Sequence, residues 1–285
     1  MSILAALEQQ RANAKHSVRL ASKALRQWVD QPDGSVSSAL FVVGEPTTAW
    51  TPLIESLQHT DGLWVHTPDS AIAFDADRLR SPASIALLTR LTPAGVVIYA
   101  ASHEGHLADR LLDVHDTARV LWVYERFEAA VERALDASEP QSALQTLRDI
   151  AEAREHLAGW QGERLPDDLI ADLRDIIHDD LTAADAVALL WWMRHSFFFS
   201  LQLETNPRVA ITPAARLCQS ADAEDVFAWI GCANAVPHMG TSPMTDLLHD
   251  APPPALDPRV SQRCAALQSR LDDAVATSGV AARLP

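Results

Sequence analysis

The chain has 285 residues, of which 48% are hydrophobic and 21% charged, an ordinary balance for a globular protein. Its 10 glycines and 17 prolines exclude a fibrous or low-complexity chain, and no apolar stretch approaches the roughly 20 residues of a membrane span. The formal net charge is −15, and so acidic a surface repels phosphate backbones. We therefore expect neither nucleic acid nor an anionic membrane as a partner, although a local basic pocket remains compatible with this charge.

Three widely spaced cysteines, Cys218, Cys232 and Cys264, indicate free thiols rather than a disulfide framework. The first residues do not contain a basic stretch followed by an apolar core, because the charged Glu8 and Arg11 come too early. No signal peptide is therefore expected, and the predicted location is the cytoplasm.

Residues 2–30 are expected to form an amphipathic helix, because apolar side chains recur there at three- and four-residue steps. The members of this apolar stripe are Leu4, Leu7, Val18, Ala21, Leu25 and Trp28. An exposed apolar stripe of this length needs a cover. We expect it to pack on its own domain or on a second copy of the chain, which would give a homodimer; docking to another protein is the alternative.

Continuous apolar runs predict buried strands at residues 39–43, 63–65, 95–99 and 119–124, with a shorter run at 208–211. Amphipathic segments separate several of them, including a predicted helix over 106–114. Continuous apolar strands that alternate with helices are typical of a parallel sheet covered on both faces. The predicted fold class is therefore α/β, a parallel sheet flanked by helices.

The second half of the chain reads as mainly helical. Thr182 is a candidate N-cap for a helix through 188–193 that is apolar on all sides, which predicts burial. Asp257 and Pro258 are a cap and a first helical residue, and they predict a terminal helix. We expect a single domain over 1–285. Its parts are an N-terminal helix (1–30), a sheet core (39–135), a helical acceptor-side region (136–250) and a C-terminal helix (257–277).

Several segments carry motif-like sequences in a particular order. Residues 44–51 read GEPTTAWT, 122–133 read WVYERFEAAVER, 191–199 read WWMRHSFFF, 203–209 read LETNPRV and 264–271 read CAALQSRL. Over roughly residues 39–273 this order resembles the bacterial sulfotransferases that use 3′-phosphoadenosine 5′-phosphosulfate (PAPS). The resemblance implies a P-loop NTPase-like sulfotransferase fold with a helix-rich second half.

The resemblance places the donor-binding loop after the first strand, where backbone N–H groups and a helix N-terminus can hold phosphate. The positions that it assigns to donor binding there are Gly44, Pro46, Thr47, Thr48 and Thr51. Thr47 stands where the family has a basic residue, and Ala49 replaces a second glycine. The loop has therefore lost part of the chemistry that the resemblance implies.

The second anion site that the resemblance implies has changed as well. The arginine and serine that hold the 3′-phosphate in the family correspond to Glu125 and Arg133. A charge-assisted arginine–phosphate bond is worth roughly 1.5–3 kcal/mol, and a carboxylate in its place repels the phosphate. Arg126 or Arg133 would have to act as the substitute cation. The only lysines, Lys15 and Lys23, lie near the N-terminus, so a family lysine after the 95–99 strand has no counterpart.

His103 and His106 follow the 95–99 strand, at the end of a strand where open α/β sheets bind ligands. Either residue is a candidate for the base that deprotonates an acceptor hydroxyl. Since the chain has 11 histidines, solvated or capping histidines are the alternative reading. Together with His115, His103 and His106 have a spacing that loosely resembles that of metal ligands, but we predict no metal site.

These observations leave two main hypotheses about function. In the first, the chain is a sulfotransferase-like pseudoenzyme with decayed PAPS-binding loops, used as a binding or regulatory partner. In the second, it is an active sulfotransferase that moves a sulfuryl group from PAPS to a hydroxyl or amine of a small molecule or glycan, with non-standard donor contacts. PAPS or adenosine 3′,5′-bisphosphate binds only if the donor site survives. An unrelated α/β binding module is a third reading.

Overall fold

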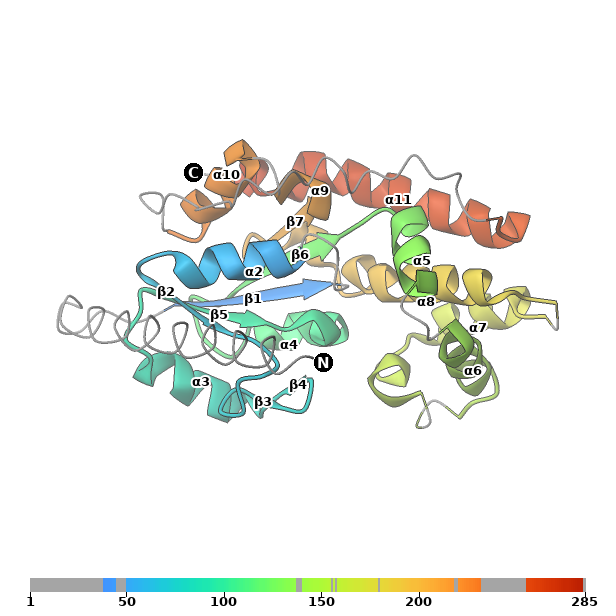
Figure 1. Ribbon diagram of the computed structural model, residues 1–285, viewed down its shortest axis with the longest axis horizontal. Coiled ribbons are helices and arrows are strands. Elements are labelled where there is room, and N and C mark those ends of the chain that lie inside the picture. Colours follow the sequence, from blue (N-terminus) through green and yellow to red (C-terminus); the bar gives the residue numbers. More distant parts are fainter. Residues whose placement is uncertain are drawn as a thin grey trace, which may run out of the picture.

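The computed structural model describes residues 38–44, 50–136, 140–154, 156, 158–178, 180–217, 220–231 and 255–283. Within them lies a five-stranded sheet, all parallel, in the order β2-β5-β1-β6-β7 (Figure 1). Its strands are β1 (Ser38–Gly44), β2 (Leu63–His66), β5 (Val96–Ala100), β6 (Arg119–Tyr124) and β7 (Val209–Pro213). The predicted α/β class is confirmed. The helix expected over 2–30 lies outside the described residues.

Helices surround this sheet, and a small antiparallel hairpin joins β2 to the next helix (Figure 1). The hairpin strands are β3 (Phe74–Asp75) and β4 (Arg78–Leu79). The helices are α2 (Trp50–His59), α3 (Pro82–Leu91), α4 (Ala108–Leu111), α5 (Phe127–Asp136), α6 (Pro140–Ala151), α7 (Asp167–Ile176), α8 (Ala183–Ser200), α9 (Ala214–Leu217), α10 (Ser220–Trp229) and α11 (Pro258–Ser278). In the described part of the chain no helix is both long and apolar enough to cross a membrane.

Two hydrophobic clusters lie on the two faces of the sheet, because successive side chains of a strand point to opposite faces. On one face Phe41 and Trp122 pack with α5, α6, α8 and α11. On the other face Leu40 and Leu121 pack with α2 and α10. Burial on both faces explains why the strand sequences are continuously apolar rather than alternating.

Helix α8 is the central helix of the larger cluster, in contact with α5, α6 and α11. Thr182 and Asp185 form a reciprocal capping box at its start, as the Thr182 cap predicts. Apolar residues occur on all its sides, and most of its residues are buried. Asp257 caps α11, and Pro258 is its first residue, so this prediction is also confirmed.

The helix predicted over 106–114 is wrong in its bounds. The chain instead forms a 3-10 helix, η1 (Ser102–Leu107), followed by the single-turn α4. Glu104 has non-helical dihedrals inside η1. A Cβ at Gly105 would lie 3.1 Å from the Trp122 ring, so η1 packs tightly on β6. These tertiary contacts override the helical pattern of the sequence. The hairpin and α3 were not predicted.

Gly44 ends β1 with a φ of 115°, a conformation that essentially only glycine adopts. A Cβ added to this residue would lie 1.9 Å from the Val123 carbonyl oxygen of β6. The close approach of two strand backbones therefore requires glycine here, whatever the loop that follows binds.

We predict that Gly44→Ala lowers the free energy of unfolding by more than about 3 kcal/mol, because both the dihedral and the strand contact are lost. Gly62 is a matched control, since its φ is 80° and a Cβ added there would meet no atom within 4 Å. Gly62→Ala should cost only about 1–2 kcal/mol, the strain of the dihedral alone. Urea denaturation measures both values, and equal losses would contradict the requirement for close strand approach.

His195 of α8 lies at the centre of the larger cluster and is fully buried. Its Nδ1 accepts a hydrogen bond of 3.1 Å from the Trp122 indole N–H. Burial lowers the pKa of His195 to about 3, and burial also lowers the pKa of His66 on β2 to about 4. Both histidines are therefore neutral in the folded protein at pH 7, and His195 has a core role.

These lowered pKa values predict that stability falls as the pH drops below about 6.5. The unfolded chain then takes up protons that the folded chain cannot, which favours unfolding. Each histidine should contribute about 2 kcal/mol of this loss between pH 7 and pH 5. We expect His195→Gln and His66→Gln each to reduce the difference between urea denaturation at the two pH values. An unchanged difference in both variants would show that neither histidine is held neutral.

Candidate functional site

The carboxyl ends of β1, β5 and β6 meet at one edge of the sheet, the edge at which α/β proteins bind ligands. A cavity of about 20 Å³ lies there, with space for about one water molecule. Its lining residues are Gly44, Ser102, Gly105, His106, Trp122, Trp160, Gln161, Met193, Arg194 and Phe197. The predicted positions Gly44 and His106 are thus brought together at this edge.

His106 lies beside this cavity with only 3% of its surface exposed. Its Nε2 is 3.0 Å from a carboxylate oxygen of Glu163. Hydrogen bonds from Arg78 lower the pKa of Glu163 to about 2, so this carboxylate is ionised and can only accept. His106 therefore donates from Nε2. Burial lowers the pKa of His106, which leaves a neutral ring with a lone pair on Nδ1.

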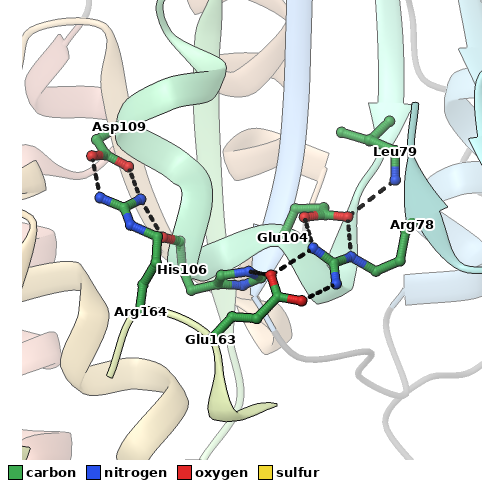
Figure 2. Close-up of polar contacts among 7 residues, drawn as sticks. All are labelled: Arg78, Leu79, Glu104, His106, Asp109, Glu163 and Arg164. Atoms are coloured by element: carbon green, nitrogen blue, oxygen red, sulfur yellow. Dashed lines mark hydrogen bonds and ion pairs between the residues drawn. The ribbon is translucent and has the colours of Figure 1, made fainter. Parts of the chain in front are cut away.

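Arg78 of β4 connects two carboxylates at this edge (Figure 2). Its Nε donates to Glu104 at 2.7 Å, and its terminal nitrogens donate to Glu163 at 2.8 and 3.0 Å. Glu104 is 1% exposed and also accepts from the Leu79 backbone N–H at 3.0 Å. A buried carboxylate needs such partners, because isolated burial of a charge is strongly unfavourable. We call Arg78, Glu104, His106 and Glu163 the edge network.

The segment that carries Glu163 covers the cavity with Trp160, a residue of η3 (Gly159–Gly162). The His103 ring stacks on the Trp160 ring at 4.7 Å, and the Arg194 guanidinium lies 4.8 Å from the same ring. Burial, with Arg194 as a lesser cause, lowers the pKa of His103. The stacking contact therefore holds this candidate base against the covering segment.

Arg164, the residue after Glu163, binds the covering segment to the chain around His106 and Asp109 (Figure 2). Its guanidinium binds both carboxylate oxygens of Asp109, at 2.6 and 2.8 Å, and donates to the His106 carbonyl oxygen at 2.7 Å. Arg164 has a φ of 57°, a left-handed conformation that costs about 1–2 kcal/mol in a non-glycine residue. The bidentate pair with Asp109 offsets this strain.

The two positions that the resemblance assigns to the 3′-phosphate lie next to each other. Arg133 of α5 donates from Nε to Glu125 at 2.9 Å, and Glu125 is 7% exposed. Arg126 points to solvent, with its side chain 70% exposed, and pairs with Glu128 at 3.3 Å. The structure thus pairs one predicted cation with the carboxylate beside it and places the other on the surface.

Most of the remaining donor-loop positions that the resemblance implies, namely Pro46, Thr47 and Thr48, lie outside the described residues. The backbone of Thr51 lies in the first turn of α2. His115, part of the loose metal-ligand spacing, bonds Thr117 rather than the other histidines. Among the described residues no group of His, Cys, Asp or Glu is arranged to hold a metal ion.

Sequence reasoning missed Arg78, Glu104, Trp160 and Glu163. Arg78 is separated from Glu104 by 26 residues and from Glu163 by 85. None of these residues stands in a periodic pattern, and Glu104 entered the sequence analysis only within the loose metal-ligand spacing of residues 103–106. Only a three-dimensional arrangement of the hairpin, η1 and η3 brings these side chains together.

No protein-family model and no curated protein sequence matches the chain. The crystal structure of a sulfotransferase from Alicyclobacillus acidocaldarius is similar, with 12% sequence identity and a TM-score of 0.41. The match covers 86% of this chain and 96% of that chain. Similarity at this level assigns no role to a residue, so the roles proposed below rest on the side chains of this chain.

Removal of the cation from the edge network should be costly. We predict that Arg78→Met lowers the free energy of unfolding by about 3 kcal/mol, because Glu104 would remain buried without its cation. Arg126→Met is the matched control, and the loss of its exposed pair with Glu128 should change stability by less than about 0.5 kcal/mol. Urea denaturation at pH 7 measures both. Similar values for the two variants would contradict a structural role for Arg78.

Proposed function

We propose that this chain is a sulfotransferase-like protein that no longer binds PAPS and acts as a non-catalytic binding or regulatory partner. The observation that carries the proposal is the ion pair between Glu125 and Arg133. These two residues occupy the positions at which the sequence resemblance implies a phosphate-binding arginine and serine. An internal carboxylate would hold the place of the nucleotide phosphate.

Electrostatics supports this proposal. A phosphate that approached Arg133 would meet the Glu125 carboxylate, and two like charges at about 4 Å repel by about 4 kcal/mol at an effective dielectric constant of 20. Arg126 is a poor replacement, since its exposed guanidinium would lose hydration and its contact with Glu128. The cavity of about 20 Å³ at the sheet edge, as the described residues bound it, is also far smaller than the roughly 300–1,000 Å³ of pockets for small molecules.

A second candidate function is an active sulfotransferase, and the pair of His106 and Glu163 favours it. With Nε2 donating to Glu163, the Nδ1 lone pair of His106 is the basic atom. In this candidate His106 takes the proton of the acceptor hydroxyl as that oxygen bonds to sulfur. The bond between sulfur and the phosphate oxygen of PAPS breaks, and adenosine 3′,5′-bisphosphate leaves with that oxygen and the electron pair of the bond. Glu163 keeps the imidazole oriented.

Calorimetric titration with adenosine 3′,5′-bisphosphate tests the first candidate. We expect no saturable heat up to millimolar nucleotide for the natural chain. The triple variant Thr47→Arg, Ala49→Gly, Glu125→Arg should gain measurable affinity, because it restores the cations and the glycine that the resemblance implies. The same variant with Glu128→Arg in place of Glu125→Arg is the control, since it adds equal charge outside the predicted phosphate position.

Micromolar binding by the natural chain would overturn the proposal and leave the active sulfotransferase. That candidate is then tested by transfer of labelled sulfate from PAPS to a panel of phenols, amines and sugars. His106→Asn should abolish transfer if His106 is the base, whereas His103→Asn should reduce it less. Nucleotide binding with no transfer to any acceptor would indicate a nucleotide-binding partner without catalysis.

A further inference from the structure

A second hollow lies away from the sheet edge and is lined mainly by residues of α7, α8 and α11. Figure 1 labels these three helices. The hollow is a groove of about 480 Å³. From α8 it is lined by Trp192, Ser196 and Phe199, whereas Met193 and Phe197 line the cavity at the sheet edge. The groove therefore uses a different face of α8 from the candidate site, although its α7 and α8 residues belong to the region 136–250 that we expected on the acceptor side.

Two arginines of α11 lie over two aromatic rings of α8 along this groove. The Arg263 guanidinium is 5.5 Å from the Trp192 ring centroid, and that of Arg270 is 4.0 Å from the Phe199 ring centroid. Both the arginines and the aromatic residues are seven positions apart, close to two helical turns. The two helices thus run side by side in the same direction. The two stacked arginine–aromatic pairs lie about two helical turns apart along the groove, and we call their positions its two levels.

The two levels differ in charge. Arg263 is neutralised by Asp172 of α7, with a nitrogen–oxygen distance of 2.6 Å. Arg270 makes no ion pair or hydrogen bond with any described residue. A guanidinium stacked on a ring keeps its N–H donors in its own plane, where they fit a planar or tetrahedral oxyanion. The Arg270 level therefore offers an unneutralised cation above an apolar floor.

The other lining residues are apolar or have hydrogen-bond partners within the chain, and they include the carboxylate of Asp168, which accepts from the Leu169 backbone N–H at 2.9 Å. Leu169 of α7 and Leu267 of α11 contribute aliphatic surface. The hydroxyls of Ser196 and Ser200 donate to carbonyl oxygens of their own helix, at 2.8 and 3.4 Å. Arg270 is consequently the group that would fix the orientation of a bound molecule. The groove has the volume of a small-molecule site and a mixed apolar and polar lining, in which Arg270 is a cation without an ion-pair partner among the described residues.

We propose that this groove binds an organic monoanion with an aromatic body, such as an arylsulfonate, an aryl sulfate ester or an aryl carboxylate. The anionic group binds the guanidinium of Arg270, and the ring packs against Phe199 and Leu267. Asp172 already neutralises Arg263, so a dianion gains no second cation and a monoanion is the better match. The inference is independent of the donor site, because the two hollows share no lining residue.

Titration of naphthalene-2-sulfonate into the full chain tests this proposal by calorimetry. We expect saturable binding with one site per chain, and at least about tenfold weaker binding by Arg270→Gln. Arg90→Gln is the matched control, an exposed arginine on α3 that should leave the affinity unchanged. Naphthalene-2-methanol carries the same ring without the charge and should bind at least about tenfold more weakly than the sulfonate.

Ala266→Trp is a second variant that fills the groove from an exposed position on α11, and it should abolish binding even if Arg270→Gln fails to fold. Circular dichroism melting of each variant separates loss of the site from loss of the fold. No saturable binding, or an affinity that neither Arg270→Gln nor Ala266→Trp lowers, overturns the proposal. Adenosine 3′,5′-bisphosphate titrated into Arg270→Gln reports on the donor site separately, so failure of one proposal is distinguishable from failure of the other.

Discussion

The buried carboxylate of Glu104 is the constraint on which the sheet edge depends. With 1% of its surface exposed, it needs a cation and hydrogen-bond donors close by, and Arg78 and the Leu79 N–H supply them. Arg78 can do so only if the β3–β4 hairpin lies against η1. Its remaining donors then bind Glu163, which brings the covering segment over the cavity. One buried charge thus positions three segments that are far apart in sequence.

A second ion pair, between Glu125 and Arg133, likewise neutralises charge within the chain. These residues neutralise each other at the two positions that the sequence resemblance assigns to the 3′-phosphate. In both the edge network and the pair of Glu125 and Arg133, the charged side chains near the carboxyl ends of the strands form ion pairs within the chain. Because its cations are already paired, this edge is stabilised but has less affinity for an added anion. An anion that displaced one of the carboxylates would leave a buried charge unpaired.

The sequence predicted the elements whose signals are local. β6 was expected over 119–124 and has those bounds, and the cap of α8 at Thr182 follows from local hydrogen bonding. The helix over 106–114 was mispredicted because Gly105 packs on Trp122, a contact that no local pattern reports. Only part of the candidate site was predictable. His106 lies in η1, shortly after the end of β5 at Ala100, but its partner Glu163 comes from a segment 57 residues away.

The register between α8 and α11 connects the fold to the groove. Asp185 is buried, and its carboxylate accepts from the Thr182 N–H at the start of α8 and from the Asp257 N–H at the start of α11, at 2.9 and 2.7 Å. One side chain thereby aligns the first turns of two parallel helices. Since α-helices rise by a fixed distance per residue, this alignment determines which rings of α8 lie beneath the arginines of α11 two and four turns later. The cation above Phe199 is therefore positioned by a capping interaction at the opposite end of both helices.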